Sequence, residues 1–257
     1  MKTFLINLDR SPERLQYMDE LLKHRSLPYT RVSAVDGTAI DRPVYASVSL
    51  TMPEIGCFLS HRGIWELIVS EDIPVALILE DDIEISPDLS QLIENPNWLP
   101  GDNFIVKLDT TGTRIALKET GLKAPTQRSL LELKDRHCGT GGYLLSNAAA
   151  HRLVDLSKNP MVPVDLFLFD RKRGQTADIG TYQMLPAPIA HKIVIEDVTG
   201  TAFETTIPKK HLWKPTRRLS KSEKLTRELQ RIVLQSSRAL LVLLGLTSTR
   251  YIKAKFR

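Results

Sequence analysis

Short apolar runs alternate along the chain with segments whose apolar residues recur at helical spacing. The clearest run covers residues 75–79, which follow Pro74 and end at three acids, a pattern typical of a strand buried on both faces. Leu15, Met18 and Leu22 recur three and four positions apart, as on one helix face. The alternation predicts an α/β fold whose central sheet is mixed, mainly parallel, and joined by right-handed crossovers.

The predicted helices have recognisable start signals. Thr51 and Glu54 are spaced as in a capping box, in which each side chain satisfies a free backbone N–H of the other. Ser11 can cap the first helix. The predicted helices span residues 12–24, 51–70, 87–93, 146–156 and 163–170, and the predicted strands span residues 4–8, 29–35, 75–79, 103–109, 128–134 and 143–145.

Glu80, Asp81 and Asp82 directly follow the buried run. Ligands of open α/β sheets bind at the carboxyl ends of the strands, so chemistry is expected here. Strand alternation points Glu80 and Asp82 to one side and Asp81 to the other. Two carboxylates with open coordination positions suit Mn²⁺ or Mg²⁺ shared with a phosphorylated ligand. A solvated acidic turn is the alternative interpretation.

Charge divides the chain into two predicted parts, a globular domain at residues 1–208 and a basic tail at residues 209–257. The tail holds fourteen Lys and Arg residues against two acids, so the domain carries a net charge of −7 within the overall +5. Ser220 can cap a helix that reaches about residue 245 with a leucine-rich face and Lys and Arg elsewhere. Such basic amphipathic helices bind anionic membrane surfaces. A helix that packs on the domain or on another subunit is the alternative.

Cysteine usage and hydropathy favour a cytoplasmic protein. Cys57 and Cys138 are the only cysteines, which excludes a disulfide framework. The apolar run near the N-terminus is interrupted too soon for a signal peptide. The sequence contains no run of about 18 apolar residues, so it predicts no membrane-spanning helix. With the basic tail, this predicts a peripheral protein on the inner face of the cytoplasmic membrane.

Five phrases together resemble glycosyltransferase family 25, which includes bacterial lipooligosaccharide galactosyltransferases and animal collagen galactosyltransferases. They begin at Ile6 (INLDRSPER), Ala34 (AVDG), Glu54 (EIGCFLSH), Leu77 (LILEDDI) and Gly141 (GGYLLS). The resemblance covers roughly residues 1 to 195. It implies a GT-A fold, a UDP-sugar donor, a divalent cation and transfer with inversion at the anomeric carbon.

The resemblance also implies roles for particular acids. The triplet from Glu80 to Asp82 is similar to the family's Asp-x-Asp motif, which holds the metal on the donor diphosphate. Its first residue is Glu, so the metal ligand is expected to be Asp82 with either Glu80 or Asp81. An inverting displacement needs a base for the acceptor hydroxyl. We expect Asp165, near a shorter acidic motif, to be that base and Asp109 to be the second candidate, although either can be a structural or capping acid.

Four polar residues at the end of the first strand are candidates for donor binding. Asn7, Asp9, Arg10 and Arg14 surround a helix start, where N–H and guanidinium groups can meet uracil, ribose or diphosphate. Plain salt bridges are the alternative for the two arginines. His61 can face the site or be a buried structural histidine.

Gly139, Gly141 and Gly142 lack phosphate-loop spacing, and we interpret them as room for sugar or acceptor beside the backbone. His191 is a further candidate for a metal or diphosphate contact. These assignments predict a glycosyltransferase that moves a hexose, galactose by resemblance, from a UDP-sugar to a lipopolysaccharide or lipooligosaccharide acceptor.

Two other functions are compatible with clustered acids or with a basic tail. A metal-dependent phosphohydrolase also uses clustered acids, but the chain lacks a dense His and Asp set for two metals. A non-catalytic, nucleic-acid-binding protein could act through the basic tail. The tail interleaves leucines and not aromatics, and the domain is acidic, so we expect no nucleic-acid partner.

Overall fold

The structure is a computed structural model that describes residues 1–41, 45, 48–158, 162–203 and 248–257. An eight-stranded sheet runs in the order β2-β1-β3-β10-β5-β11-β9-β8. Its strands are β1 (Lys2–Asn7), β2 (Thr30–Ser33), β3 (Val75–Leu79), β5 (Phe104–Lys107), β8 (Leu122–Ala124), β9 (Arg128–Glu132), β10 (Gly142–Ser146) and β11 (Gly180–Leu185).

Two smaller sheets lie beside it. One has the order β4-β12-β6 and the other pairs β13 with β7. Their strands are β4 (Ile83–Ile85), β6 (Asp109–Thr110), β7 (Arg114–Lys118), β12 (Ile189–His191) and β13 (Thr249–Lys253). The helices are α1 (Pro12–His24), α2 (Met52–Ser70), α3 (Leu89–Glu94), α4 (Asn147–Leu156), α5 (Val164–Phe169) and α6 (Lys192–Ile195), with a 3-10 turn η1 (Gly37–Ala39).

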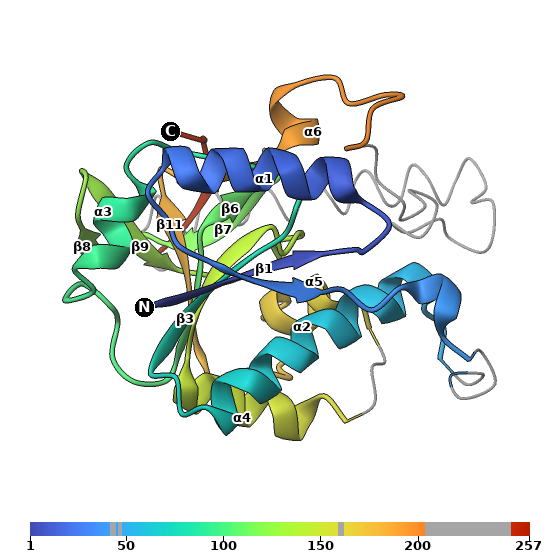
Figure 1. Ribbon diagram of the computed structural model, residues 1–257. Coiled ribbons are helices and arrows are strands. Elements are labelled where there is room, and N and C mark those ends of the chain that lie inside the picture. Colours follow the sequence, from blue (N-terminus) through green and yellow to red (C-terminus); the bar gives the residue numbers. More distant parts are fainter. Residues whose placement is uncertain (42–44, 46–47, 159–161, 204–247) are drawn as a thin grey trace, which may run out of the picture.

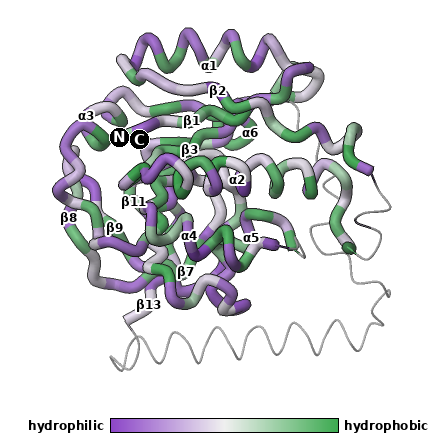
Figure 2. The backbone as a smooth tube through the Cα atoms, turned by 60° about the horizontal axis from the view of Figure 1, so that its bottom comes forward, coloured by the Kyte–Doolittle hydropathy of each residue, from purple (hydrophilic) through white to green (hydrophobic). Residues whose placement is uncertain are grey.

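Helices cover both faces of the main sheet (Figure 1). Phe4 and Ile6 of β1 point into the core under α2, α4 and α5. Leu5 points the other way and packs with Met18 and Leu22 of α1. Because helices pack on both faces of the sheet, nearly every side chain of the central strands is buried, and the strand sequences are mostly apolar. The tube coloured by hydropathy shows hydrophobic segments in these strands (Figure 2).

The predicted α/β class is confirmed, but the expectation of a mainly parallel sheet is wrong. Within the eight-stranded sheet, β1–β2, β1–β3 and β5–β11 pair in parallel. The pairs β3–β10, β5–β10, β9–β11 and β8–β9 are antiparallel. The cause is the long stretch after β5 without a crossover helix, which sends β10 back between β3 and β5.

The predicted helix cap at Thr51 is confirmed, and the one at Ser11 is wrong. The capping box is present, with the Thr51 N–H donating to Glu54 Oε2 at 2.8 Å. Ser11 occupies the N-cap position of α1, but its side chain makes no capping hydrogen bond. Its carbonyl instead accepts a hydrogen bond from Asn7 Nδ2 at 3.1 Å.

The predicted tail helix at residues 220–245 lies outside the described residues. The end of the predicted tail is described, and it is part of the globular fold. Thr249–Lys253 forms β13, antiparallel to β7, and Ala254 is buried. No helix among the described residues has the length and apolarity needed to cross a bilayer.

Candidate active site

The three acids after β3 diverge as strand alternation predicts. Glu80 and Asp82 offer ligand atoms that lie, with one from His191, within 4.8 Å of one another. Asp81 points elsewhere, toward α1. Its two oxygens accept from Asn7 Nδ2 at 2.7 Å and from Arg14 Nη1 at 3.0 Å. Glu80 and Asp82 therefore face a common space, whereas Asp81 connects the end of β3 to the end of β1 and to α1.

Asp81 is buried, and burial raises the pKa of its carboxyl although Arg14 opposes the shift. Both oxygens already have donors, so Asp81 has less to offer a cation than its two neighbours. The contacts of Asp81 favour Glu80 as the partner of Asp82, and the identity of the metal ligands stays a prediction.

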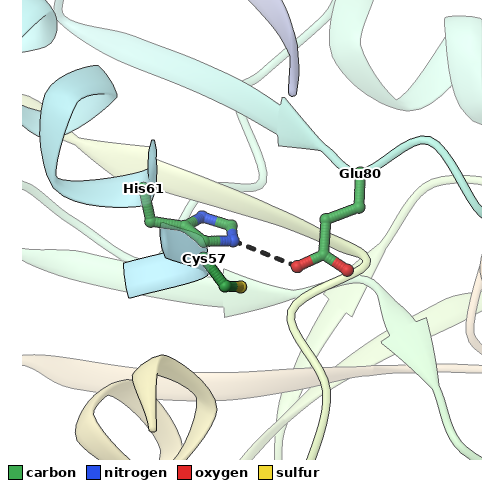
Figure 3. Close-up of side chains that lie close together, drawn as sticks. All are labelled: Cys57, His61 and Glu80. Carbon is green, nitrogen blue, oxygen red and sulfur yellow. Dashed lines mark hydrogen bonds and ion pairs between the residues drawn. The ribbon is translucent and has the colours of Figure 1, made fainter. Parts of the chain in front are cut away.

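On the α2 side of Glu80 lies a group that we call the His61 cluster: Cys57, His61, Trp65, Glu80 and Tyr143 (Figure 3 shows three of them). The His61 ring joins Glu80 Oε1, 3.0 Å from its Nε2, to the Tyr143 hydroxyl, 2.9 Å from its Nδ1. Trp65 Nε1 donates to the same hydroxyl at 2.9 Å. His61, Trp65 and Tyr143 are completely buried.

Donor and acceptor roles in this cluster follow from the groups themselves. An indole N–H can only donate, so the Tyr143 oxygen accepts from Trp65 and its proton is available to His61 Nδ1. The other ring nitrogen, Nε2, then carries the imidazole proton and donates it to Glu80. Thr140 Oγ1 also donates to Glu80 Oε1, at 2.5 Å. The two donors to Oε1 leave Oε2 as the oxygen best placed for a ligand.

On the other side lies the His191 cluster, which we define as Asp82, Lys107, Asp109, His137 and His191. His191 Nε2 is 3.0 Å from Asp109 Oδ2, and its Nδ1 is 3.5 Å from Asp82 Oδ1. Lys107 Nζ donates to Asp109 Oδ1 at 2.7 Å. Lys107 and Asp109 have no exposed side-chain surface. A buried ion pair thus supports the histidine that faces Asp82.

Charge in the His191 cluster is set by these contacts. Burial opposes ionisation of Asp109, but Lys107 and His191 outweigh it and hold the pKa of that carboxyl well below its usual range. Burial likewise opposes the charged form of His191, yet Asp109 and Asp82 raise the pKa of His191 well above its usual value. His191 is therefore an imidazolium that bridges two carboxylates.

His137 behaves in the opposite way. Burial and the neighbouring Lys107 lower the pKa of His137 to about 3, so its ring is neutral. Its Nδ1 lies 2.8 Å from Gln183 Oε1.

The glycines after Cys138 make room for protein and not for sugar, contrary to our interpretation of the sequence. A Cβ on Gly139 or Gly141 would lie 2.8 or 2.7 Å from His191 Nε2, and one on Gly142 would lie 2.3 Å from Ile189 Cδ1. Gly139 also has a φ of +86°, which favours glycine. Small residues at these positions let β12 and His191 pack against the segment before β10.

Asp165 and Asp109, the two predicted bases, have different surroundings. Asp165 lies in the first turn of α5 and accepts from the backbone N–H groups of Gly139 and Leu166 at 3.1 and 2.7 Å. Burial, assisted by Glu80, raises the pKa of Asp165. Asp109 is fully buried with both oxygens paired.

The predicted donor-binding residues lie together at the end of β1. Arg10 pairs with Asp36 at 2.7 Å and is half exposed. Asp9 is exposed and pairs with Arg31 and Ser33, which lower the pKa of its carboxyl. Asn7 and Arg14 hold Asp81, as described above.

Sequence reasoning missed several members of these clusters. Cys57 was missed, although it lies four positions before the predicted candidate His61 on one helix, a spacing that indicates a shared helix face. Lys107, His137 and Tyr143 carried no such signal. Each is buried by strands that are distant in sequence.

The residues fit a divalent cation. Glu80 and Asp82 supply the carboxylate oxygens that Mn²⁺ and Mg²⁺ prefer, and His191 borders the same space. Asp82 Oδ1 is buried and has no hydrogen-bond partner. A buried carboxylate oxygen without a donor is costly, and a cation between Glu80 and Asp82 would satisfy it.

Comparison with known proteins decides the family. The family model described as glycosyltransferase family 25 (LPS biosynthesis protein) matches residues 1–168. The chain belongs to glycosyltransferase family 25. Membership favours glycosyl transfer over the phosphohydrolase and nucleic-acid-binding alternatives, and it implies a nucleotide-sugar donor.

Family 25 relatives include bacterial and animal proteins. The chain is 25 % identical over 199 residues to the lipooligosaccharide biosynthesis protein lic2B of Haemophilus influenzae, covering 71 % of this chain and 73 % of the relative. It is 26 % identical over 186 residues to the lacto-N-neotetraose biosynthesis glycosyltransferase LgtB of Neisseria gonorrhoeae, covering 66 % and 67 %. Human procollagen galactosyltransferase 2 is 31 % identical over 187 residues, which are 64 % of this chain and 29 % of that protein.

Proposed function

We propose that this family 25 enzyme transfers a hexose, galactose, from a UDP-sugar to a lipopolysaccharide or lipooligosaccharide acceptor, with inversion and with a divalent cation. The family description and the name of the Haemophilus influenzae relative support the acceptor class, and the name of the human relative supports galactose. We further propose that the mixed α/β fold is of the GT-A type. The sheet order and the acids at the end of β3 support this part of the proposal.

The observation that carries the proposal is the convergence of Glu80 and Asp82 on one space, where the buried Asp82 Oδ1 accepts no hydrogen bond and its ion-pair partner, His191 Nδ1, is 3.5 Å away. These two residues would hold the cation, and His191 borders the same space. When bound, a divalent cation stabilises the negative charge that UDP gains as the glycosidic bond breaks.

The chain's own residues would do the remaining work. Asp165 would take the proton from the acceptor hydroxyl, because its raised pKa brings it closer to the range where a base is effective. Asp109 would position His191, because it is completely buried and the charged side chains of Lys107 and His191 hold its two oxygens. Asp165, in contrast, is partly exposed and accepts from backbone N–H groups. Asp109 therefore moves in this proposal from second candidate base to positioning residue.

The donor nucleotide would lie over the ends of β1 and β3. Asn7 and Arg14 fix Asp81 there, and Arg10 and Asp9 lie at the exposed edge of the same segment. Arg10 lies just before α1 and Arg14 in its first turn, and guanidinium groups at a helix start suit a diphosphate. The α1 side would then receive UDP, and the sugar would face Glu80 and Asp165.

Attachment to the inner face of the cytoplasmic membrane belongs to the same proposal. Its support is the sequence of residues 209–247, rich in Lys, Arg and Leu, and each basic residue near an anionic surface contributes about 1 kcal/mol. The enzyme would then act where a lipid-linked acceptor resides.

Calorimetric titration with UDP and with UDP-galactose tests the donor site. Each titration is run with Mn²⁺ and with EDTA, on the unaltered protein, on Asp82→Ala and on the matched control Asp178→Ala. Asp178 is a half-exposed acid that pairs with Arg152 just before β11. Binding that needs Mn²⁺, survives in the control and vanishes in Asp82→Ala is expected. Metal-independent binding, or binding retained by Asp82→Ala, would contradict the assigned role.

A further inference from the structure

The His61 cluster contains a second set of metal-ligating groups. Cys57 and His61 lie one turn apart on α2, and their side chains point toward Glu80 at the end of β3 (Figure 3). The Cys57 sulfur, a ring nitrogen of His61 and a carboxylate oxygen of Glu80 all lie within 4.8 Å of one another. Small movements of these side chains would bring three ligands to a single ion.

The donor types distinguish this set from the one at Asp82. Thiolate and imidazole are the ligands that Zn²⁺ prefers, whereas Mg²⁺ and Mn²⁺ favour oxygen. Three protein ligands also leave the fourth tetrahedral position of Zn²⁺ open. We propose that Cys57, His61 and Glu80 form an inhibitory site for Zn²⁺, which takes Glu80 away from the cation that the donor requires.

Protons must move when Zn²⁺ binds. The Cys57 thiol gives up its proton to solvent as its sulfur binds. The imidazole proton of His61 passes from Nε2 to Nδ1, so Nε2 can bind. The Tyr143 hydroxyl keeps its proton but rotates it away from the ring, and Nδ1 then donates to the Tyr143 oxygen. That oxygen has two lone pairs and also accepts from Trp65. Such support of the second ring nitrogen is common for metal-binding histidines.

The electrostatic surroundings favour a cation. Glu80 and Asp165 place negative charge near Cys57, and this charge attracts a dication. The ion would in turn stabilise the thiolate that Cys57 forms when it binds.

Antagonism follows because Glu80 belongs to both sets of ligands. Zn²⁺ held by Cys57, His61 and Glu80 would remove one carboxylate from the pair with Asp82. The inhibition rests on the proposed function, since it assumes that Glu80 and Asp82 hold the catalytic cation. The existence of the site does not rest on it.

Cobalt spectroscopy tests the site without reference to activity. Co²⁺ replaces Zn²⁺ in thiolate sites, and a thiolate ligand gives a near-ultraviolet charge-transfer band. The band is expected in the unaltered protein and in Cys138→Ser, and is expected to be lost in Cys57→Ser. No band in the unaltered protein, or a band retained by Cys57→Ser, would overturn the proposal. Thermal unfolding of each variant confirms that it is folded.

A second measurement tests the antagonism. UDP binding at fixed Mn²⁺ is titrated with Zn²⁺, and each variant is compared with its own zinc-free level. In Cys57→Ser the Zn²⁺ concentration for half inhibition is expected to rise roughly tenfold or more, with Cys138→Ser unchanged. Equal sensitivity in Cys57→Ser would refute the antagonism. If no protein binds UDP, the proposed function fails, while the cobalt band still decides the Zn²⁺ site.

Discussion

The two histidine clusters beside the acids of β3 hold those acids in different ways. In the His61 cluster, an indole, a phenol and an imidazole form a directed chain of hydrogen bonds that ends at Glu80. In the His191 cluster, a buried lysine, two carboxylates and an imidazolium hold one another by charge. One carboxylate is oriented by hydrogen bonds from neutral groups, and the other faces a cationic ring.

Glu80 and Asp82 are only two positions apart, yet their carboxylates differ in hydrogen bonding and in neighbouring charge. Glu80 Oε1 has two donors, whereas Asp82 Oδ1 has none. Neutral hydrogen-bond chains fix direction, and buried charges remain sensitive to the loss of any partner. Substitutions in the two clusters should therefore differ in both size and kind.

The largest expected effect comes from the buried ion pair. Lys107→Met leaves Asp109 charged and buried beside His191, so the free energy of unfolding should fall by about 3–5 kcal/mol. Denaturant titration measures it. Lys134→Met, which removes a partly exposed partner of Glu132, should cost about 0–1 kcal/mol. Equal losses of unfolding free energy in the two variants would show that the buried ion pair stabilises the protein no more than an exposed pair does.

Asp82→Asn should separate activity from stability. Loss of the carboxylate is expected to lower kcat by about 10²–10³-fold. It should change the free energy of unfolding by less than about 1 kcal/mol, because the Asp82–His191 pair is long, at 3.5 Å, and partly exposed, and His191 keeps its closer partner Asp109. Asp81→Asn should instead cost about 1–3 kcal/mol of stability, since Asn7 and Arg14 lose a charged acceptor. Galactosyl transfer from UDP-galactose and chemical denaturation give the two readings. A stable, inactive Asp81→Asn would reverse the assignments.

Tyr143→Phe breaks the neutral chain at its centre. Trp65 Nε1 and His61 Nδ1 lose their partner while buried, and stability should fall by about 1–3 kcal/mol. Tyr29→Phe is a matched control, because the Tyr29 hydroxyl donates to Asp19 in a half-buried setting, and it should cost less. If both variants unfold like the parent protein, the chain does not contribute to stability.

The smallest effect concerns pH. The folded pKa of His137 is lowered to about 3, so the unfolded chain binds the extra proton as pH falls below about 6.5. The stability contributed by neutral His137 is present above that pH and should decrease by about 1 kcal/mol between pH 7 and pH 5.5. His137→Gln should lose less stability over this interval, whereas His151→Gln, at an exposed position, should follow the parent protein.

Local features of this molecule could be predicted from sequence. The buried run before Glu80 becomes β3, and the alternation of the next three side chains is confirmed, because both depend only on adjacent residues. The capping box at Thr51 is local in the same sense. Ser11 shows the limit: its position is right, but Asn7 engages its backbone and no side-chain cap forms.

The assembled site depended on pairings that periodicity does not encode. His191 reaches Asp82 because β12 pairs with β4 and β6, which follow β3 and β5. In the sequence, Lys107 is a single polar residue within a predicted strand. Its burial results from the neighbouring strands and from Phe169, whose ring centroid lies 4.5 Å from Lys107 Nζ. The sequence indicates that another group lies close to the backbone at Gly139 and Gly141. It does not indicate that this group is the His191 ring.

Strand β13 determines how the basic segment can be removed for study. Cutting the chain after residue 203 would also delete β13 and expose the hydrogen-bonding edge of β7, which β13 now covers. Open strand edges pair with other chains and promote aggregation. A loss of vesicle binding in such a truncated protein would then be confused with self-association. An internal deletion that keeps residues 248–257 preserves the covered edge and tests membrane attachment alone.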